Sequence, residues 1–133
     1  MNERSVWTEH VVCRLDDVAD PGARGFLVGD GDWPFRGFVV RHAEGISAYA
    51  NICPHARHPL DMLPDEFLAR DDSMIRCSSH GALFMPGTGE CVVGPCVGAH
   101  LLSLETRVDA SGDVWVRAPD SMRDEALGGW TGL

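Results

Sequence analysis

Two short segments carry the residues that decide the fold: CPHARHPL at positions 53–60 and CSSHGALF at positions 77–84. Together they supply two thiols and two imidazoles: Cys53, His55, Cys77 and His80. This donor set suits zinc or an iron–sulfur centre. A zinc finger generally takes both cysteines from one loop and both histidines from another, whereas here each segment mixes the two. The mixed pattern favours a diiron cluster with both cysteines on one iron and both histidines on the other, and a zinc site is the alternative.

Short β-rich runs surround these segments on both sides. We expect strands at residues 9–15, 25–29, 36–42, 45–51, 73–77, 101–108 and 113–117. Turn signals such as Pro21-Gly22 and Pro86-Gly87 separate them, so the pattern predicts an antiparallel all-β sandwich or barrel. Residues 108–116 predict a hairpin that turns at Ser111-Gly112.

Helical signals are few. Pro64 followed by two acidic residues predicts a short helix start, because proline tolerates the first turn and acids favour that end of the dipole. Phe67 and Leu68 would then pack onto the core. Residues 119–133 are expected to form a C-terminal tail, with a short helix around Met122–Leu127 as the alternative.

Composition narrows the class of protein. The chain has 133 residues, a formal net charge of -9 and five cysteines. This length suits one domain, and the acidic balance argues against a nucleic-acid partner. No apolar run approaches the roughly 20 residues that cross a bilayer, and the start shows no export signal. We therefore expect a cytoplasmic protein with no membrane partner. The odd number of cysteines in such a protein argues against a fold held together by disulfides.

The sequence resembles the Rieske-type [2Fe–2S] family, in particular its stand-alone ferredoxins. The resemblance rests on Cys53-Pro54-His55, Pro59-Leu60, Cys77-x-x-His80-Gly81-Ala82, Phe84, Gly89 and Gly94-Pro95-Cys96. It implies an antiparallel β sandwich or barrel with a small cluster-binding subdomain at one tip. The expected division is a single Rieske domain over 1–118, with cluster loops at about 52–60 and 76–84, a proline loop at about 93–97, and a tail over 119–133.

The resemblance also implies the roles of the ligands. Cys53 and Cys77 would bind the inner iron, and His55 and His80 the outer iron through Nδ1. Two imidazoles in place of two thiolates make the oxidised cluster less negative. The cluster then accepts an electron more readily, at potentials of about −150 to +300 mV.

Neighbouring positions place the expected potential at the low end of that range. High-potential members of the family carry two further cysteines joined as a disulfide, and a serine and a tyrosine whose hydroxyls bond to sulfur. At the two cysteine positions this chain has His58 and Ser79, so the disulfide cannot form. At the serine and tyrosine positions it has Ala82 and Phe84, which carry no hydroxyl.

The resemblance implies a one-electron carrier rather than an enzyme in its own right. The chain is too short to add the mononuclear-iron domain of Rieske oxygenases. The expected partners are an NAD(P)H-dependent reductase and a terminal oxygenase or similar redox enzyme. The alternative is a non-catalytic subunit or redox sensor held in a stable complex, for example a small subunit of the nitrite-reductase type.

Several other residues have less specific expectations. Cys96 is expected to pack near the cluster without binding it, and Cys13 and Cys91 to be structural thiols in strands. A Cys91–Cys96 disulfide is the alternative. His58 is expected at the surface, with redox tuning or docking as the alternative. The segment 61–73 is longer than is usual in the family, and its acids form either a solvated face or a surface that steers partners.

Overall fold

The computed structural model describes residues 7–29, 31–54, 58–61, 63, 65–69, 73–78, 81–123, 126–128, 130 and 132. In chain order its elements are β1 (Thr8–Arg14), the 3-10 turn η1 (Leu15–Asp17), β2 (Gly22–Val28), β3 (Phe35–His42), β4 (Gly45–Ala50), β5 (Ile75–Arg76), β6 (Leu83–Phe84), β7 (Cys91–Val93), β8 (Ser103–Leu104), β9 (Thr106–Val108) and β10 (Asp113–Ala118). They form three antiparallel sheets, in the orders β1-β10-β9, β2-β3-β4-β8 and β5-β6-β7. The described residues contain no α-helix, and therefore none with the length and hydropathy to span a bilayer. The all-β antiparallel prediction is confirmed.

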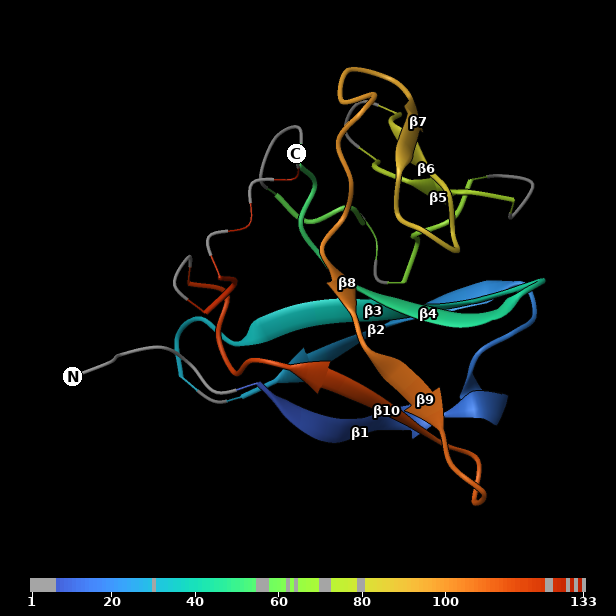
Figure 1. Cartoon of the computed structure of the whole chain (residues 1–133), viewed down its shortest axis with the longest axis vertical. Coiled ribbons are helices and arrows are strands. Elements are labelled where there is room, and N and C mark those ends of the chain that lie inside the picture. Colours follow the sequence, from blue (N-terminus) through green and yellow to red (C-terminus); the bar gives the residue numbers. More distant parts are fainter. Residues whose placement is uncertain are drawn as a thin grey trace.

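The four-stranded sheet lies between the other two, with the small sheet β5-β6-β7 at one end of the molecule (Figure 1). Alternate residues of β3 enter two separate cores: Val39 packs on one face, and Phe38 and Val40 pack on the other. On β4, Ala48 and Tyr49 divide in the same way. A strand that is buried on both faces needs apolar side chains at consecutive positions, which explains the run FVV in β3.

The lower core fills the space between the middle sheet and the sheet β1-β10-β9. Its fully buried members include Val114 and Val116 of β10, while Trp115 on the opposite face is half-buried. The predicted hairpin is confirmed, because β9 and β10 pair with Val108 opposite Val114. Gly112 in the turn has φ +89°, a left-handed conformation that favours glycine.

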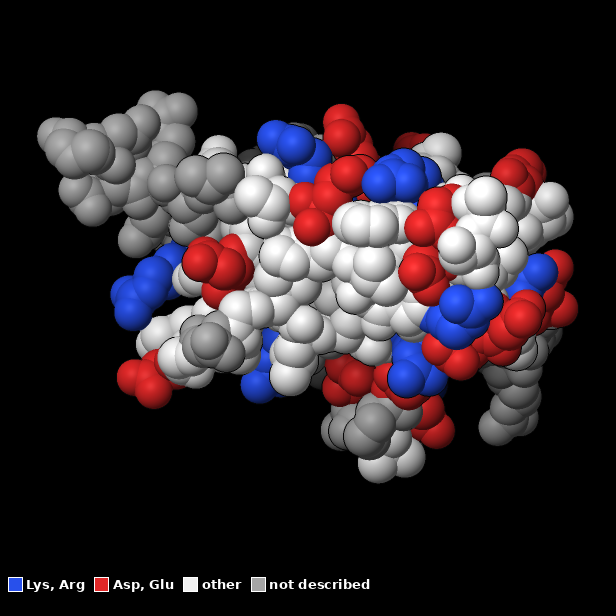
Figure 2. Space-filling model, turned by 90° about the horizontal axis from the view of Figure 1, so that it is seen from below, with Lys and Arg blue, Asp and Glu red and all other residues white. Residues whose placement is uncertain are grey.

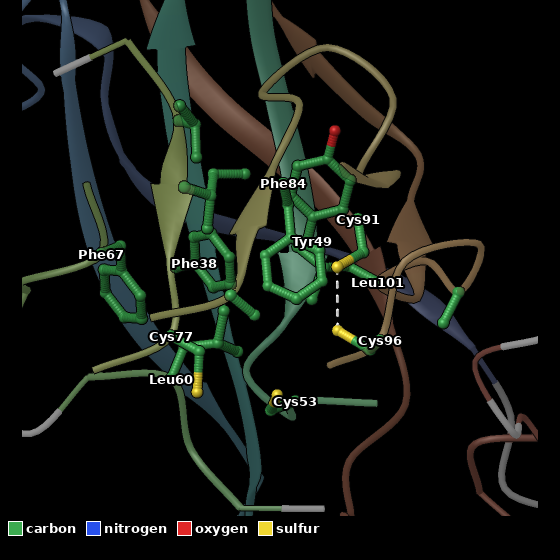
Figure 3. Close-up of a cluster of buried hydrophobic side chains, with 14 residues drawn as sticks. Phe38, Tyr49, Cys53, Leu60, Phe67, Cys77, Phe84, Cys91, Cys96 and Leu101 are labelled. Atoms are coloured by element: carbon green, nitrogen blue, oxygen red, sulfur yellow. Dashed lines mark hydrogen bonds between the residues drawn. The ribbon is translucent and has the colours of Figure 1, made fainter. Parts of the chain in front are cut away.

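The upper core lies between the other face of the middle sheet and the small sheet, and its side chains are drawn in Figure 3. It is built from the buried members Phe38, Val40, Tyr49, Cys53, Leu60, Phe67, Ile75, Cys77, Ala82, Phe84, Cys91, Cys96, Ala99 and Leu101. The rings of Phe38 and Phe67 stack with centroids 4.2 Å apart. This contact holds the segment after the first cluster loop against β3.

Two features of the strand prediction need correction. The expected strand 101–108 is divided at Glu105: β8 pairs with β4 in the middle sheet, whereas β9 pairs with β10 in the lower one. The chain changes sheets there, and the Glu105 carbonyl accepts the Arg117 N–H at 2.9 Å. The strands β6 and β7 were not expected, because two or three residues are too few to show a period.

The expected helix start after Pro64 is wrong for the residues that the structure describes, and Pro64 itself lies outside them. Asp65 has φ +66°, which is not helical, and Leu68 forms a β-bridge with Ile75. The Asp65 carboxylate instead accepts the Gly25 N–H of β2 at 2.8 Å. A tertiary hydrogen bond therefore overrides the local preference for a helix. Phe67 does pack onto the core, as expected.

The described part of the C-terminal segment packs on the domain. The Met122 N–H donates to the Trp33 carbonyl at 3.1 Å, and Trp7 Nε1 donates to the Ala126 carbonyl at 2.8 Å. The Gly132 carbonyl accepts the His100 N–H at 2.6 Å. The alternative of a helix around Met122–Leu127 falls partly outside the described residues.

Basic and acidic side chains are interspersed on the face that is seen from below Figure 1 (Figure 2). Two ion pairs link the strands of the lower sheet and its hairpin, Arg107 with Glu9 and Arg14 with Asp113, each at 3.1 Å. The Arg107 hydrogen bond lowers the pKa of Glu9. Exposed pairs of this kind contribute little stability, about 0–1 kcal/mol each.

Candidate metal centre

The first expected cluster loop follows β4 and contains Cys53, which is fully buried. The Cys53 N–H donates to the His58 carbonyl at 2.8 Å and closes the loop. The Asn51 side chain holds its far end: Oδ1 accepts the Leu60 N–H at 2.7 Å, and Nδ2 donates to Asp61 Oδ1 at 2.9 Å. A buried amide with both polar atoms bonded fixes the backbone around Cys53.

The second expected cluster loop follows β5 and contains Cys77, which is also fully buried. The Cys77 N–H donates to the Ala82 carbonyl at 2.9 Å, and the Cys77 carbonyl accepts the Gly81 N–H at 3.0 Å. The next residue joins the two loops, because the Ser78 N–H donates to the Leu60 carbonyl at 2.8 Å. Segments that are distant in sequence thus meet at one end of the molecule.

The two thiols enter this site from different loops, and in Figure 3 both sulfurs lie on the same side of the buried aromatic rings. The other two expected ligands, His55 and His80, lie outside the described residues. Within the residues that are described, no group of three or more side chains is arranged to hold a metal ion. The structure thus describes two buried thiols, Cys53 and Cys77, and the assignment of all four residues as ligands stays a prediction.

The proline loop packs directly on the second cluster loop. Gly94 has φ +104°, and a Cβ at this position would lie 2.9 Å from the Ala82 Cα, so only glycine fits without a shift. Pro95 is exposed, whereas Cys96 is 8% exposed and packs in the upper core, as expected. Burial raises the pKa of the Cys96 thiol to about 12, together with its hydrogen bond to Cys91 and the nearby Cys53 and Cys77. Cys96 is therefore protonated at neutral pH.

The described residues fit an iron–sulfur group. Cys53 and Cys77 supply two soft, buried donors of the kind that such clusters require. The Ser78 hydroxyl is buried with no hydrogen-bond partner in the described part of the chain, which leaves a donor beside Cys77. An unpaired buried hydroxyl normally costs stability unless a partner is supplied.

Asn51 is a residue of the candidate site that sequence reasoning missed. It is the one polar side chain among the buried residues that the structure describes, at 7% exposure. The sequence offered one signal for it, a single amide side chain at the end of an apolar run, two positions before Cys53. Its partners, Leu60 and Asp61, are identified only by the folded loop.

The family can now be assigned. The model of the Rieske [2Fe-2S] domain matches residues 8–110, which include both cluster loops and the proline loop. The chain belongs to the Rieske [2Fe–2S] domain family. Membership implies that this Rieske protein binds an iron–sulfur cluster.

Solved structures show the same fold. The ferredoxin of carbazole 1,9a-dioxygenase from Nocardioides aromaticivorans IC177 is 27% identical to this Rieske protein, with a TM-score of 0.63; the match covers 85% of this chain and 99% of that one. A chain from the complex of reduced oxygenase and oxidised ferredoxin in carbazole 1,9a-dioxygenase is 25% identical, with a TM-score of 0.61 and coverage of 90% and 99%.

A protein assigned as the small subunit of an NADH-dependent nitrite reductase from Mycobacterium tuberculosis shares the fold at 21% identity. Its TM-score is 0.53, and the match covers 84% of this chain and 96% of that one. The search of curated proteins gave no match to the chain.

Proposed function

We propose that this Rieske protein is a one-electron carrier that holds one [2Fe–2S] cluster through Cys53, His55, Cys77 and His80. The two cysteines would bind one iron and the two histidines the other. The observation that carries the proposal is the hydrogen bond from Ser78 to Leu60, which brings two loops with one buried thiol each to the same end of a Rieske domain.

The protein's own residues determine how the site would work. When bound, the cluster would supply one-electron redox chemistry. Asn51 and the backbone bonds of the two loops keep the thiols in place, and burial of both sulfurs excludes water. Ala82 and Phe84 are fully buried and bring no hydroxyl to the site, which supports a potential at the low end of the family range.

The proposed partners are an NAD(P)H-dependent reductase as donor and a terminal oxygenase as acceptor. The support is the 27% identity to the ferredoxin of a dioxygenase system, of which this chain matches 99%. A small carrier of this kind would dock transiently, through an interface below about 1,200 Å².

Electron paramagnetic resonance of the anaerobically purified protein tests the cluster. We expect a rhombic signal that appears only after reduction, and a midpoint potential in the lower half of the family range of about −150 to +300 mV. Cys53→Ser and Cys77→Ser should lose the signal, while the matched variant Cys13→Ser, in β1, should keep it. A stoichiometric zinc content with no signal would overturn the proposal.

The carrier role is tested separately from the cluster. A carrier should be reduced by a reductase with NAD(P)H and then reoxidised by the acceptor, electron for electron. Co-purification with a large enzyme that survives high salt would instead favour the stable subunit, because transient docking is weakened by salt.

A further inference from the structure

Two cysteines outside the proposed ligand set lie in direct contact. Cys91 opens β7 and is fully buried, and Cys96 lies in the proline loop. Their sulfur atoms are 2.9 Å apart, and the Cys96 thiol donates to the Cys91 sulfur (Figure 3). The Cys91 thiol in turn donates to the Val93 carbonyl at 3.4 Å. The two sulfurs therefore need to approach by only about 0.9 Å to reach a disulfide bond of about 2.05 Å.

From this geometry we propose that Cys91 and Cys96 are a site of reversible disulfide formation, with hydrogen peroxide as the oxidant. Both S–H bonds and the O–O bond of peroxide break, one S–S bond forms, and the two thiol hydrogens leave in two molecules of water. The cysteines lose two electrons and peroxide gains them. A thiol reductant reverses the reaction by exchange through a mixed disulfide.

The backbone already holds the two cysteines in position for this bond. The Cys91 N–H donates to the Ala99 carbonyl at 2.9 Å, and the Ala99 N–H donates to the Cys96 carbonyl at 2.8 Å. These bonds close the segment between the two cysteines into a compact loop. Side-chain rotation in a loop that is already closed can bring the sulfurs together without breaking the sheet.

Access to the pair favours a small, neutral oxidant. Cys96 is 8% exposed, and the neighbouring Val93 and Val97 are exposed at 49% and 64%. Peroxide can reach a thiol at this depth, whereas a bulky disulfide reagent is hindered. Because a buried thiol that is hydrogen-bonded to its neighbour is a poor nucleophile, we expect the reaction to need peroxide in excess.

The bond would affect the cluster site through the loop that it ties down. Gly94, between the two cysteines in sequence, packs on Ala82 of the second cluster loop. A disulfide would hold this loop against β7 and restrict its opening. This consequence rests on the proposed function. It predicts that the protein with the Cys91–Cys96 disulfide loses iron to a chelator more slowly than the protein with two free thiols.

Peptide mapping tests the disulfide directly. The purified protein is treated with excess hydrogen peroxide, sampled while the visible absorbance is retained, denatured and alkylated with iodoacetamide. Cleavage after Glu90 and Glu105 by glutamyl endopeptidase releases residues 91–105, which contain Cys91 and Cys96 and no other cysteine. We expect this peptide without alkyl groups and lighter by two hydrogen atoms, and doubly alkylated after dithiothreitol. Double alkylation after peroxide, or bonds to Cys53 or Cys77 instead, would overturn the proposal.

Two variants complete the test. Cys96→Ala should yield Cys91 without a disulfide and an iron-release rate that peroxide does not slow, whereas Cys13→Ser should behave as the wild type. Equal iron-release rates in the wild type with and without the Cys91–Cys96 disulfide would refute the effect on the loop. A chain that bound no cluster would show no visible absorbance, and the same mapping after peroxide treatment would still report the Cys91–Cys96 bond, so failure of the proposed function and failure of the disulfide are distinguishable.

Discussion

Ser78 places a buried hydroxyl beside Cys77 without a partner in the described part of the chain. Hydrogen bonds to the sulfurs of an iron–sulfur group stabilise its reduced form and raise its potential. We expect Ser78→Ala to lower the midpoint potential by about 40 mV, the equivalent of one ordinary hydrogen bond of about 1 kcal/mol. Potentiometry with Ser103→Ala, an exposed serine of β8, as the control checks this. An unchanged potential would show that the hydroxyl does not reach the cluster.

Asn51 holds the far end of the first expected cluster loop, and its Oδ1 atom is the acceptor for the Leu60 N–H. Asn51→Ala leaves the Leu60 N–H buried without a partner, which costs about 1–3 kcal/mol. We expect that loss in urea denaturation, together with faster release of iron to a chelator. The matched variant Asp61→Ala keeps the bond from Leu60 to Asn51 and removes only the acceptor of Asn51 Nδ2. Because Asp61 is partly exposed, water can replace this acceptor, and we expect a smaller loss. Equal losses in the two variants would contradict the assignment of Leu60 as the essential contact.

Residues of the candidate site were predictable from the sequence where the residue type and its spacing pointed to metal binding. Cys53 and Cys77 stood out through their spacing to histidines, and the structure buries both at one end of the molecule. Asn51 did not stand out, because its role depends on partners that only the fold brings near. Cys91 and Cys96 were expected as separate thiols or, in the alternative, as a disulfide, and the structure places them in contact as two free thiols.

Phe67 connects the segment between the cluster loops to the middle sheet. Its ring is 1% exposed and stacks on Phe38 of β3, with an angle of 8° between the planes. We expect Phe67→Ala to reduce the free energy of unfolding by about 3–5 kcal/mol, since it leaves a cavity in the upper core. Urea denaturation measures this, with Trp33→Ala, at a 62% exposed position, as the control. A loss below about 1 kcal/mol would mean that the segment is not anchored there.

The turn between β9 and β10 depends on an ionised carboxylate. The Trp115 indole N–H and the backbone N–H groups of Asp113 and Ser111 lower the pKa of Asp109 below its ordinary value of 3.8. A lowered pKa in the folded state means that the ionised carboxylate stabilises the fold. This contribution is complete above pH 3.8 and is lost as the pH falls through the lower, folded value.

Asp109→Asn removes that titration. We expect its melting temperature to lie below that of the wild type at pH 7 and the difference to narrow as the pH falls toward 3. Thermal melts followed by circular dichroism over this range measure the difference. A constant difference would contradict a role for the charge.

Strands were predictable where the alternation of apolar and polar residues ran long enough to be recognised. The hairpin of β9 and β10 was found from its turn and from the alternation of Val114, Trp115 and Val116. The break at Glu105 and the left-handed Asp65 were not found, because both are set by hydrogen bonds to distant strands.

At the scale of the whole molecule, the net charge of -9 predicts the direction of salt effects. Opposite charges attract and like charges repel at long range. At 0.1 M salt, both interactions are largely screened between exposed charges more than about 10 Å apart. Electron transfer from the reduced protein to cytochrome c, which is basic, should therefore slow as salt is added. Transfer to ferricyanide, which is an anion, should become faster. Stopped-flow rates with both acceptors measure the two slopes, and slopes of the same sign would contradict the prediction.

The all-β architecture and the position of the site at one end of it followed from the paired motif and its resemblance. The arrangement of three layers did not, because the apolar run in β3 is consistent with burial on both faces but does not show which sheet covers each face. That knowledge required the pairing of β4 with β8 and of β9 with β10.

The middle sheet limits which changes of length the chain tolerates. Successive residues of β3, Phe38 and Val39, belong to opposite cores, so deleting one residue within the strand would exchange the two sets of side chains that follow. Both the hairpin layer and the cluster loops would lose their support at once. Insertions are therefore better tolerated in the turn at Ala43 and Glu44, between β3 and β4, where added residues leave both cores in register.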